Sequence, residues 1–109
     1  MFALFQIIAL CAAAAVAPNY TVLIREQTAP ERAVRMPLVG SVCILDAVEA
    51  LKRSPRDLAR MDLWIERVEG GELLELRVDW VAISHRGMTA TNYQILAGDR
   101  LFLQVRPAK

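Results

Sequence analysis

The sequence predicts an α+β domain in which a mixed sheet of four to five strands packs on one helix. Among its 109 residues, one segment has a helical stripe of apolar side chains, and shorter segments have β-branched or alternating apolar residues. Two pairs of these shorter segments are joined by turn-like residues, as in β-hairpins. A chain of this length holds one domain at most, so the helix and the strands share a single core.

The first predicted hairpin consists of residues 20–26 and 32–39. The segment YTVLIRE is rich in β-branched and aromatic residues, which favour strands. Pro30 marks the turn between the two strands. Pro37 weakens the second strand and predicts an edge position or a bulge.

The helix is predicted from the segment GSVCILDAVEALKR. Its apolar residues recur at the spacing of one helical face: Ile44, Ala47, Val48 and Leu51. Ser41 is expected to cap its beginning, and Lys52 and Arg53 are expected in its last turn, where they suit the helix dipole. Pro55 is expected to end it.

The second half of the chain predicts three more strands. Residues 61–68 and 73–78 flank Gly70-Gly71, which is a hairpin signal. Residues 79–84 predict a short helical turn, residues 85–92 a loop, and residues 100–105 the last strand. The resulting order, hairpin, helix, hairpin, loop and strand, suits a β-grasp, the ubiquitin-like roll in which a mixed sheet wraps one helix.

The residues before this domain predict a leader. Residues 2–17 are apolar except for Gln6 and carry no charged side chain. The run is shorter than the roughly 20 residues that cross a bilayer as a helix, and it ends in small residues, as a secretory leader does. We expect an apolar leader helix over residues 1–17, either cleaved or kept as a membrane anchor, with a buried core helix as the other alternative. The domain over residues 18–109 is then secreted to the periplasm or cell envelope.

The composition offers no catalytic constellation. His85 is the only histidine, and Cys43 is the only cysteine after the leader. Cys43 lies at the start of the predicted helix and is expected to be a buried or half-buried structural thiol. A small enzyme that uses Cys43 or His85 is the remaining catalytic alternative. One histidine and one cysteine are too few for a zinc site, so we expect no metal and no cofactor. The charges of thirteen basic and twelve acidic residues nearly cancel, so no overall positive charge attracts a nucleic acid, and we expect no nucleic-acid partner.

Two groups of side chains are candidates for contact with a ligand. One comprises aromatic residues that can stack on a sugar ring or pack in the core: Trp64, Trp80 and Tyr93. The other is a basic cluster around a predicted linker over residues 54–60, which either is solvated or contacts an anion or acidic glycan: Lys52, Arg53, Arg56 and Arg60.

Three segments resemble the SLBB (soluble-ligand-binding β-grasp) family: GSVCILDAVEAL, MDLWIERV and LRVDWVAISHRGMTATNYQILAGDRLFL. They are similar to SLBB domains in polysaccharide biosynthesis and export proteins of planctomycete-type bacteria, and the resemblance covers about residues 20–106. The chain departs from the family in three places. Cys43 replaces a capping Thr, Lys-Arg-Ser-Pro replaces a Gly-Gly after the helix, and Ala97-Gly98-Asp99 replaces Pro-Gly-Asp. The chain has no room for the export domain of such proteins, so transport is not implied for this chain by itself.

The resemblance implies a non-catalytic envelope module that binds soluble glycan or a partner subunit in exopolysaccharide biosynthesis or export. The alternative is a stand-alone adaptor, or a remnant of a split exporter, with only a structural role. Expected partners are a polysaccharide, an envelope export or assembly protein, or a second copy joined through a sheet edge. Contact with the membrane is expected only through an uncleaved leader.

The expected contact surface consists of polar and aromatic residues before the last strand: Trp80, His85, Thr89, Thr91, Asn92 and Tyr93. Gly98 and Asp99 are expected to form a structural turn into that strand.

Overall fold

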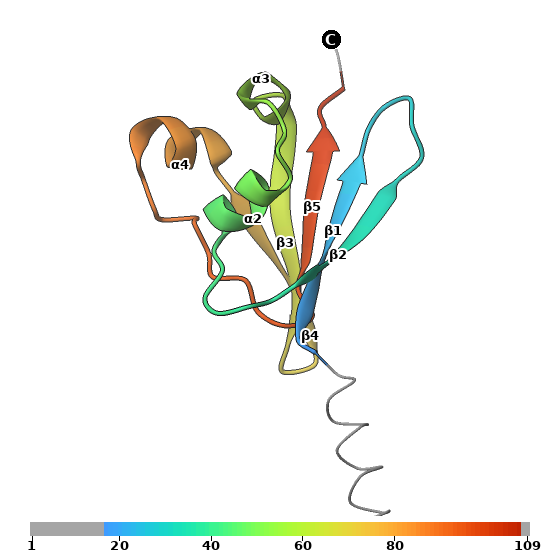
Figure 1. The fold of residues 1–109 in the computed structure, drawn as a ribbon, viewed down its shortest axis with the longest axis vertical. Helices are drawn as coiled ribbons and strands as arrows, with labels where there is room; N and C mark the ends of the chain where they lie inside the picture. The colour runs from blue at the N-terminus through green and yellow to red at the C-terminus, as the bar shows by residue number, and fades with distance from the viewer. Residues whose placement is uncertain (1–16, 108–109) are drawn as a thin grey trace, which may run out of the picture.

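The computed structural model describes residues 17–107. Over these residues the chain is an α+β domain with a mixed five-stranded sheet (Figure 1), so the predicted class and the mixed sheet are confirmed. The leader predicted over residues 1–17 lies, apart from Ala17, outside the described residues. No helix within residues 17–107 is long and apolar enough to span a membrane.

Three short helices occupy the described residues, where the sequence predicted one helix and a helical turn. The strands are β1 (Asn19–Arg25), β2 (Arg32–Pro37), β3 (Met61–Glu69), β4 (Glu72–Val78) and β5 (Arg100–Val105). The helices are α2 (Ile44–Ala50), α3 (Pro55–Leu58) and α4 (Trp80–Arg86). Helix α3 lies where a linker was predicted, because Ser54 caps it and Pro55 takes the first helical position, where a missing N–H costs nothing.

The last strand joins the two hairpins into one sheet. The strand order is β2-β1-β5-β3-β4. β1 and β5 are parallel, whereas every other neighbouring pair is antiparallel. The free edges of the sheet are therefore β2 and β4.

The helices cover one face of the sheet (Figure 1), and the core lies between the two layers. Side chains alternate along each strand, as the two-residue repeat of strands requires. The most deeply buried core residues include Val22, Ile44, Leu63, Ile65, Leu101 and Leu103. Ile44, Ala47 and Val48 of the predicted helical stripe are buried in this core.

The opposite face of the sheet carries an aromatic pair beneath arginine side chains. Trp64 and Phe102 stack with their ring centres 5.1 Å apart. The guanidinium carbons of Arg25 and Arg100 lie 4.8 and 5.8 Å from the ring centre of Phe102, and that of Arg77 lies 5.5 Å from the ring of Trp64. Long arginine side chains shield such rings while their charged ends stay in water. Trp64 is therefore covered rather than open for stacking on a ligand.

Helix α2 begins later than a cap at Ser41 would place it, so that prediction is wrong. The segment before the helix is extended because it pairs with a distant part of the chain. The N–H of Ile95 donates to the carbonyl of Val42 at 2.7 Å, and the N–H of Ile44 donates to the carbonyl of Tyr93 at 3.0 Å. This pairing holds residues 42 and 43 outside the helix.

Cys43 is the N-cap of α2. Its N–H and its thiol donate to Oδ2 of Asp46 at 3.1 and 3.2 Å. The backbone hydrogen bond from Cys43, and then the one from its thiol, holds the pKa of the Asp46 carboxyl below its usual value. The sequence predicted a buried or half-buried thiol; it is half-buried and takes part in the helix cap.

The end of α2 also differs from the prediction. The helix ends at Ala50 with Leu51 as its C-cap, so Lys52 and Arg53 lie after its last turn. Lys52 has a φ of +54°, in the left-handed region. A side chain in that region costs about 1–2 kcal/mol, which is why glycine is favoured after helices.

We expect Lys52→Gly to raise the free energy of unfolding by about 0.5–1 kcal/mol, because glycine adopts positive φ without strain. Chemical denaturation followed by tryptophan fluorescence measures the change. Lys52→Ala removes the same charge but keeps the β-carbon, and this control should show little gain. A Lys52→Gly protein no more stable than the Lys52→Ala protein would contradict the strain at this position.

Candidate binding groove

A groove lies where β4 leaves the sheet for helix α4. The pairing of β4 with β3 stops at Val78 and Leu63, whereas β3 begins at Met61. Met61 and Asp62 therefore pair with β5 on one side only. Helices α3 and α4 border the resulting gap, which forms a groove of about 330 Å³.

The backbone of Met61 presents hydrogen-bonding groups to this groove. In an antiparallel sheet, successive residues point their N–H and C=O groups to alternate sides. The N–H of Arg106 donates to the carbonyl of Arg60 at 3.0 Å, so Arg60 faces the β5 side and Met61 faces the β4 side. β4 has no residue opposite Met61, and no other described residue bonds to these two groups. A ligand hydroxyl can therefore bond to either of them.

The rim of the groove carries charges of both signs. Asp62 and Arg106 form an ion pair of 3.5 Å, and Arg106 also donates to the carbonyl of Ala59. Arg77 is 69% exposed and lies 3.4 Å from Glu75. The groove thus offers carboxylate acceptors and guanidinium donors around one opening.

Two of the predicted contact residues, Trp80 and Thr91, meet at this groove. Trp80 is 9% exposed and belongs to the core, so it forms a wall rather than a free stacking platform. Oγ1 of Thr91 accepts the N–H of Asp79 at 2.9 Å. Asp79 in turn is the N-cap of α4, because its Oδ1 accepts the N–H of Ala82 at 3.1 Å.

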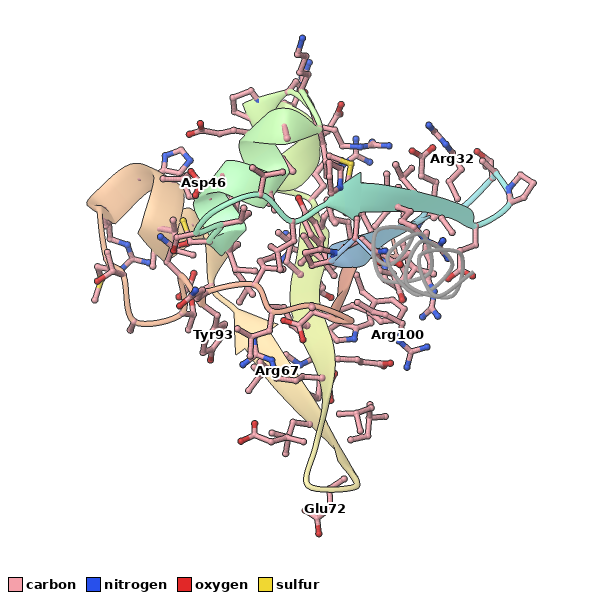
Figure 2. The ribbon with its side chains drawn as sticks, turned by 60° about the horizontal axis from the view of Figure 1, so that its bottom comes forward. Arg32, Asp46, Arg67, Glu72, Tyr93 and Arg100 are labelled. Carbon is pink, nitrogen blue, oxygen red and sulfur yellow. The ribbon has the colours of Figure 1, made fainter. Side chains whose placement is uncertain are left out.

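Asn92 and Tyr93 join the same loop to α2. Oδ1 of Asn92 accepts the N–H of Leu45 at 2.9 Å. Leu45 lies in the first turn of α2, where backbone N–H groups have no partner within the helix. The side chain of Tyr93 packs half-buried against the core, on the same side of the molecule as Arg67 (Figure 2). These two predicted contact residues therefore have structural partners.

His85 and Thr89 are exposed and do not line the groove. His85 lies in the last turn of α4 rather than in the predicted loop, because α4 continues to Arg86 and is capped by Gly87. Thr89 lies in the loop that follows, where its carbonyl accepts the N–H of Asn92 at 3.1 Å. The six predicted contact residues are thus divided between the groove, the α2 contact and the open surface.

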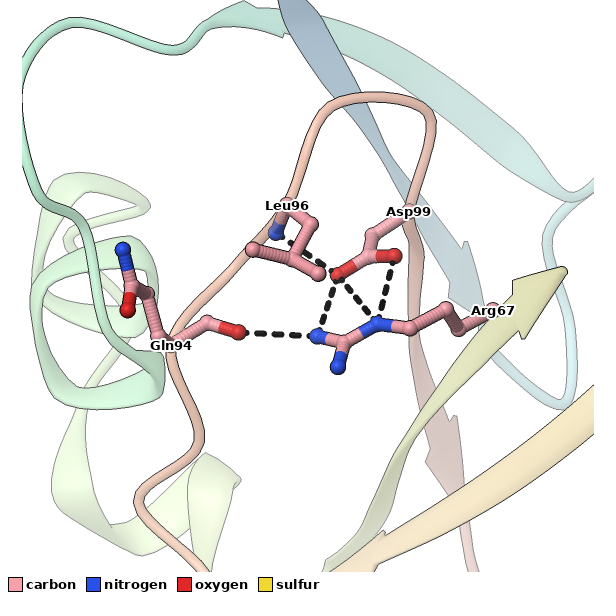
Figure 3. Close-up of polar contacts among 4 residues, drawn as sticks. All are labelled: Arg67, Gln94, Leu96 and Asp99. Atoms are coloured by element: carbon pink, nitrogen blue, oxygen red, sulfur yellow. Dashed lines mark hydrogen bonds and ion pairs between the residues drawn. The ribbon is translucent and has the colours of Figure 1, made fainter. Parts of the chain in front are cut away.

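The loop that carries Thr91 is anchored by a buried ion pair (Figure 3). The carboxylate of Asp99 is 2% exposed and accepts from Nε and Nη2 of Arg67 at 3.0 and 2.8 Å. Nη2 of Arg67 also donates to the carbonyl of Gln94 at 2.8 Å, and the N–H of Leu96 donates to Asp99 Oδ2 at 2.8 Å. The hydrogen bonds that Arg67 donates to Asp99 raise the pKa of its guanidinium above its usual value.

Gly98 and Asp99 lie in a tight turn. Gly98 has a φ of +85°, and the N–H of Asp99 donates to the carbonyl of Leu96 at 3.1 Å. Two backbone hydrogen bonds join the turn to β1. The N–H of Gly98 donates to the carbonyl of Asn19 at 2.8 Å, and the N–H of Thr21 donates to the carbonyl of Asp99 at 3.0 Å. Asp99 therefore positions the chain and is not open to a ligand.

Sequence reasoning missed Arg67, Met61 and Arg106. Arg67 follows Met61, Leu63 and Ile65 at a two-residue spacing, so the alternation alone places its side chain on the core face. A charge on that face needs a partner of opposite charge, so the alternation alone could have predicted a buried ion pair at Arg67. Met61 and Arg106 have no such signal, because their roles depend on where the neighbouring strands end.

A second cleft, of about 280 Å³, contains part of the predicted basic cluster. It is lined by residues that include Arg53, Arg60, Glu26 and Asp57. Arg53 forms an ion pair of 2.9 Å with Glu26. Because acidic and basic side chains balance in its wall, this cleft exerts no net attraction on an anion.

The side chains considered for catalysis have separate structural surroundings. The thiol of Cys43 donates to Asp46, and no hydrogen bond joins it to His85 within residues 17–107. Within the same residues, no group of three or more His, Cys, Asp or Glu side chains is placed to hold a metal ion.

Similarity to known proteins does not assign this groove. No family model and no curated protein matches the chain. Its function is therefore inferred from the chemistry of the residues that line the groove and from the arrangement of the sheet.

We expect Asp99→Asn to lower the free energy of unfolding by about 3 kcal/mol, because it leaves the largely buried Arg67 without a counter-charge. The amide oxygen still accepts from Leu96, so the loss reports on the charge. Thermal and chemical denaturation measure it.

Glu31→Gln is the matched control, because it removes the charge from an exposed pair with Arg25. This change should cost less than about 1 kcal/mol. Equal effects of the two substitutions would show that the Arg67–Asp99 pair has no special structural role.

Proposed function

We propose that the chain is a non-catalytic binding and assembly module of the cell envelope, which binds soluble glycan in exopolysaccharide biosynthesis or export. The observation that carries this proposal is the groove at the end of β4. It combines an aromatic wall, backbone groups of Met61 that have no partner among residues 17–107, and charges of both signs.

The chemistry of the groove suits a carbohydrate. Each sugar hydroxyl both donates and accepts, so a ring needs mixed partners such as the carboxylate of Asp62, the guanidinium of Arg77 and the backbone of Met61. Acidic and basic side chains are balanced around the opening, which favours a neutral glycan over a strongly charged one. The indole of Trp80 adds an apolar wall for the C–H face of a sugar.

The proposal is supported by the resemblance to the SLBB family and by the arrangement of elements. We propose that the fold is a β-grasp roll of that type, in which hairpins β1–β2 and β3–β4 flank β5 and α2 packs across the sheet. The parallel pairing of β1 with β5 supports this assignment. We further propose that residues 2–17 direct the domain to the periplasm or cell envelope.

We expect Ala59→Trp to weaken glycan binding at least about 10-fold, because the indole would fill the groove. Ala59 is exposed and has helical φ and ψ of −63° and −19°, so the backbone accepts a larger side chain. NMR titration with a neutral β-glucan hexasaccharide and a uronic-acid hexasaccharide measures binding.

Ala50→Trp is the matched control, since Ala50 is also exposed at the end of a short helix and does not line the groove. It should bind as the unmodified chain does. The proposed glycan site is wrong if neither hexasaccharide shifts resonances of groove residues, or if both tryptophan variants bind equally.

We expect bacterial cells that express the full sequence to yield a mature chain that begins within residues 12–18, in the periplasmic fraction. Mass spectrometry of the intact protein from separated fractions measures this. A chain that keeps Met1 in the membrane fraction indicates an anchor. A chain that keeps Met1 in the cytosolic fraction contradicts the envelope location.

A further inference from the structure

The free edge of β4 is suited to pairing with another strand. The opposite edge of the sheet, β2, carries Arg32, Arg35 and Pro37, and charges and proline on an edge discourage pairing. β4 spans seven residues without proline, and its charged residues, Glu72, Glu75 and Arg77, are of both signs, whereas those of β2 are both positive. It pairs with β3 on one side only, and the unpaired backbone groups of such an edge are a template for a further strand.

The hydrogen-bonding direction along β4 follows from its hairpin. Gly70 and Gly71 have φ of +60° and +81°, as in a two-residue type I′ turn, whose flanking residues exchange hydrogen bonds. Because the direction alternates along a strand, Leu73, Glu75 and Arg77 point their N–H and C=O groups to the free edge. No other described residue bonds to these groups.

Charge complementarity identifies a second copy of the chain as the partner that fits this edge. In an antiparallel pairing centred on Leu76, Glu75 of each copy lies opposite Arg77 of the other. Centring on Glu75 or Arg77 instead sets like charges against each other. Opposite charges directly across a sheet stabilise pairing, and like charges destabilise it.

We propose that β4 pairs antiparallel with β4 of a second copy, about a two-fold axis at Leu76. Glu75 and Arg77 of the two copies exchange backbone hydrogen bonds, and their side chains lie on the open face, where they are 51% and 69% exposed. On the core face, Leu74 lies opposite Val78 of the second copy, and both side chains are half-buried at the sheet edge. The two sheets become one, with the helices of both copies on the same side.

This inference rests on the proposed assembly role and names its partner. The pairing brings the grooves of two copies to opposite ends of one interface, because Arg77 and Val78 line each groove. Its failure is distinguishable from failure of glycan binding, since a monomeric chain can still be titrated with the two hexasaccharides.

A charge-swap series tests the register. The chain purified from cells that express all 109 residues is followed by light scattering and sedimentation over a dilution series from about 100 µM, and a dimer is expected in its upper range. Glu75→Arg and Arg77→Glu should each weaken the dimer about 10- to 30-fold, because each sets like charges across the interface. The double variant E75R/R77E should restore it to within about 3-fold of the unmodified chain.

A cross-link tests the centre of symmetry. In the proposed register the two Leu76 residues form a non-hydrogen-bonded pair with Cα atoms about 4.5 Å apart, within the range that a disulfide spans. In a background of Cys11→Ser and Cys43→Ser, Leu76→Cys should form a disulfide-linked dimer under mild oxidation. Leu74→Cys lies opposite Val78 of the second copy and should remain largely unlinked.

Three results would overturn the proposal. The first is an unmodified chain that stays monomeric to about 1 mM. The second is a dimer that both single charge variants leave intact, or that the double variant fails to restore. The third is equal cross-linking at positions 74 and 76. Equal thermal midpoints for the two single charge variants and the double variant, measured at a dilution at which all are monomeric, show that any loss of dimer is not a loss of folding.

Discussion

The ion pair between Arg67 and Asp99 determines how the two halves of the sheet meet. Arg67 comes from β3, whereas Asp99 immediately precedes β5 and holds Leu96 through its carboxylate. The backbone of the same turn binds β1 through Asn19 and Thr21. One buried pair therefore sets the position at which β5 enters between the two hairpins. A buried pair is weak evidence for net stability, because desolvation offsets the attraction, but the bidentate geometry specifies one register for the central strand.

Local patterns predicted most of the fold, and non-local pairing accounts for the main errors. The strands and the apolar face of α2 follow from two-residue and helical repeats within short windows. The start of α2 does not, because Ile95 and Tyr93, far along the chain, bond to the backbone of Val42 and Ile44 and hold residues 42 and 43 outside the helix. The sequence predicts a linker at α3 because a proline commonly ends the helix before it. In the structure Pro55 follows the cap Ser54 and begins α3.

The candidate site was predictable only in part. Its aromatic and polar members, Trp80 and Thr91, could be named from the sequence. The groove itself exists because the pairing of β4 with β3 ends at Leu63 and leaves the first two residues of β3 without a β4 partner. That offset depends on the hairpin register, which no single residue encodes. Asn92 was predicted to contact a ligand or partner because it is a polar residue before the last strand. In the structure its amide oxygen instead accepts the N–H of Leu45 in the first turn of α2.

The groove and the free edge of β4 share a structural origin. Where a strand leaves a sheet, the backbone groups of its neighbour lose their partners, as those of Met61 do. Where a strand has no neighbour on one side, every second residue has backbone groups without a partner in the described sheet, as Glu75 and Arg77 do. Arg77 belongs to both regions, since it lines the groove, lies near Glu75 and covers the ring of Trp64. The proposed ligand contact and the proposed strand pairing would therefore draw on the same side chain.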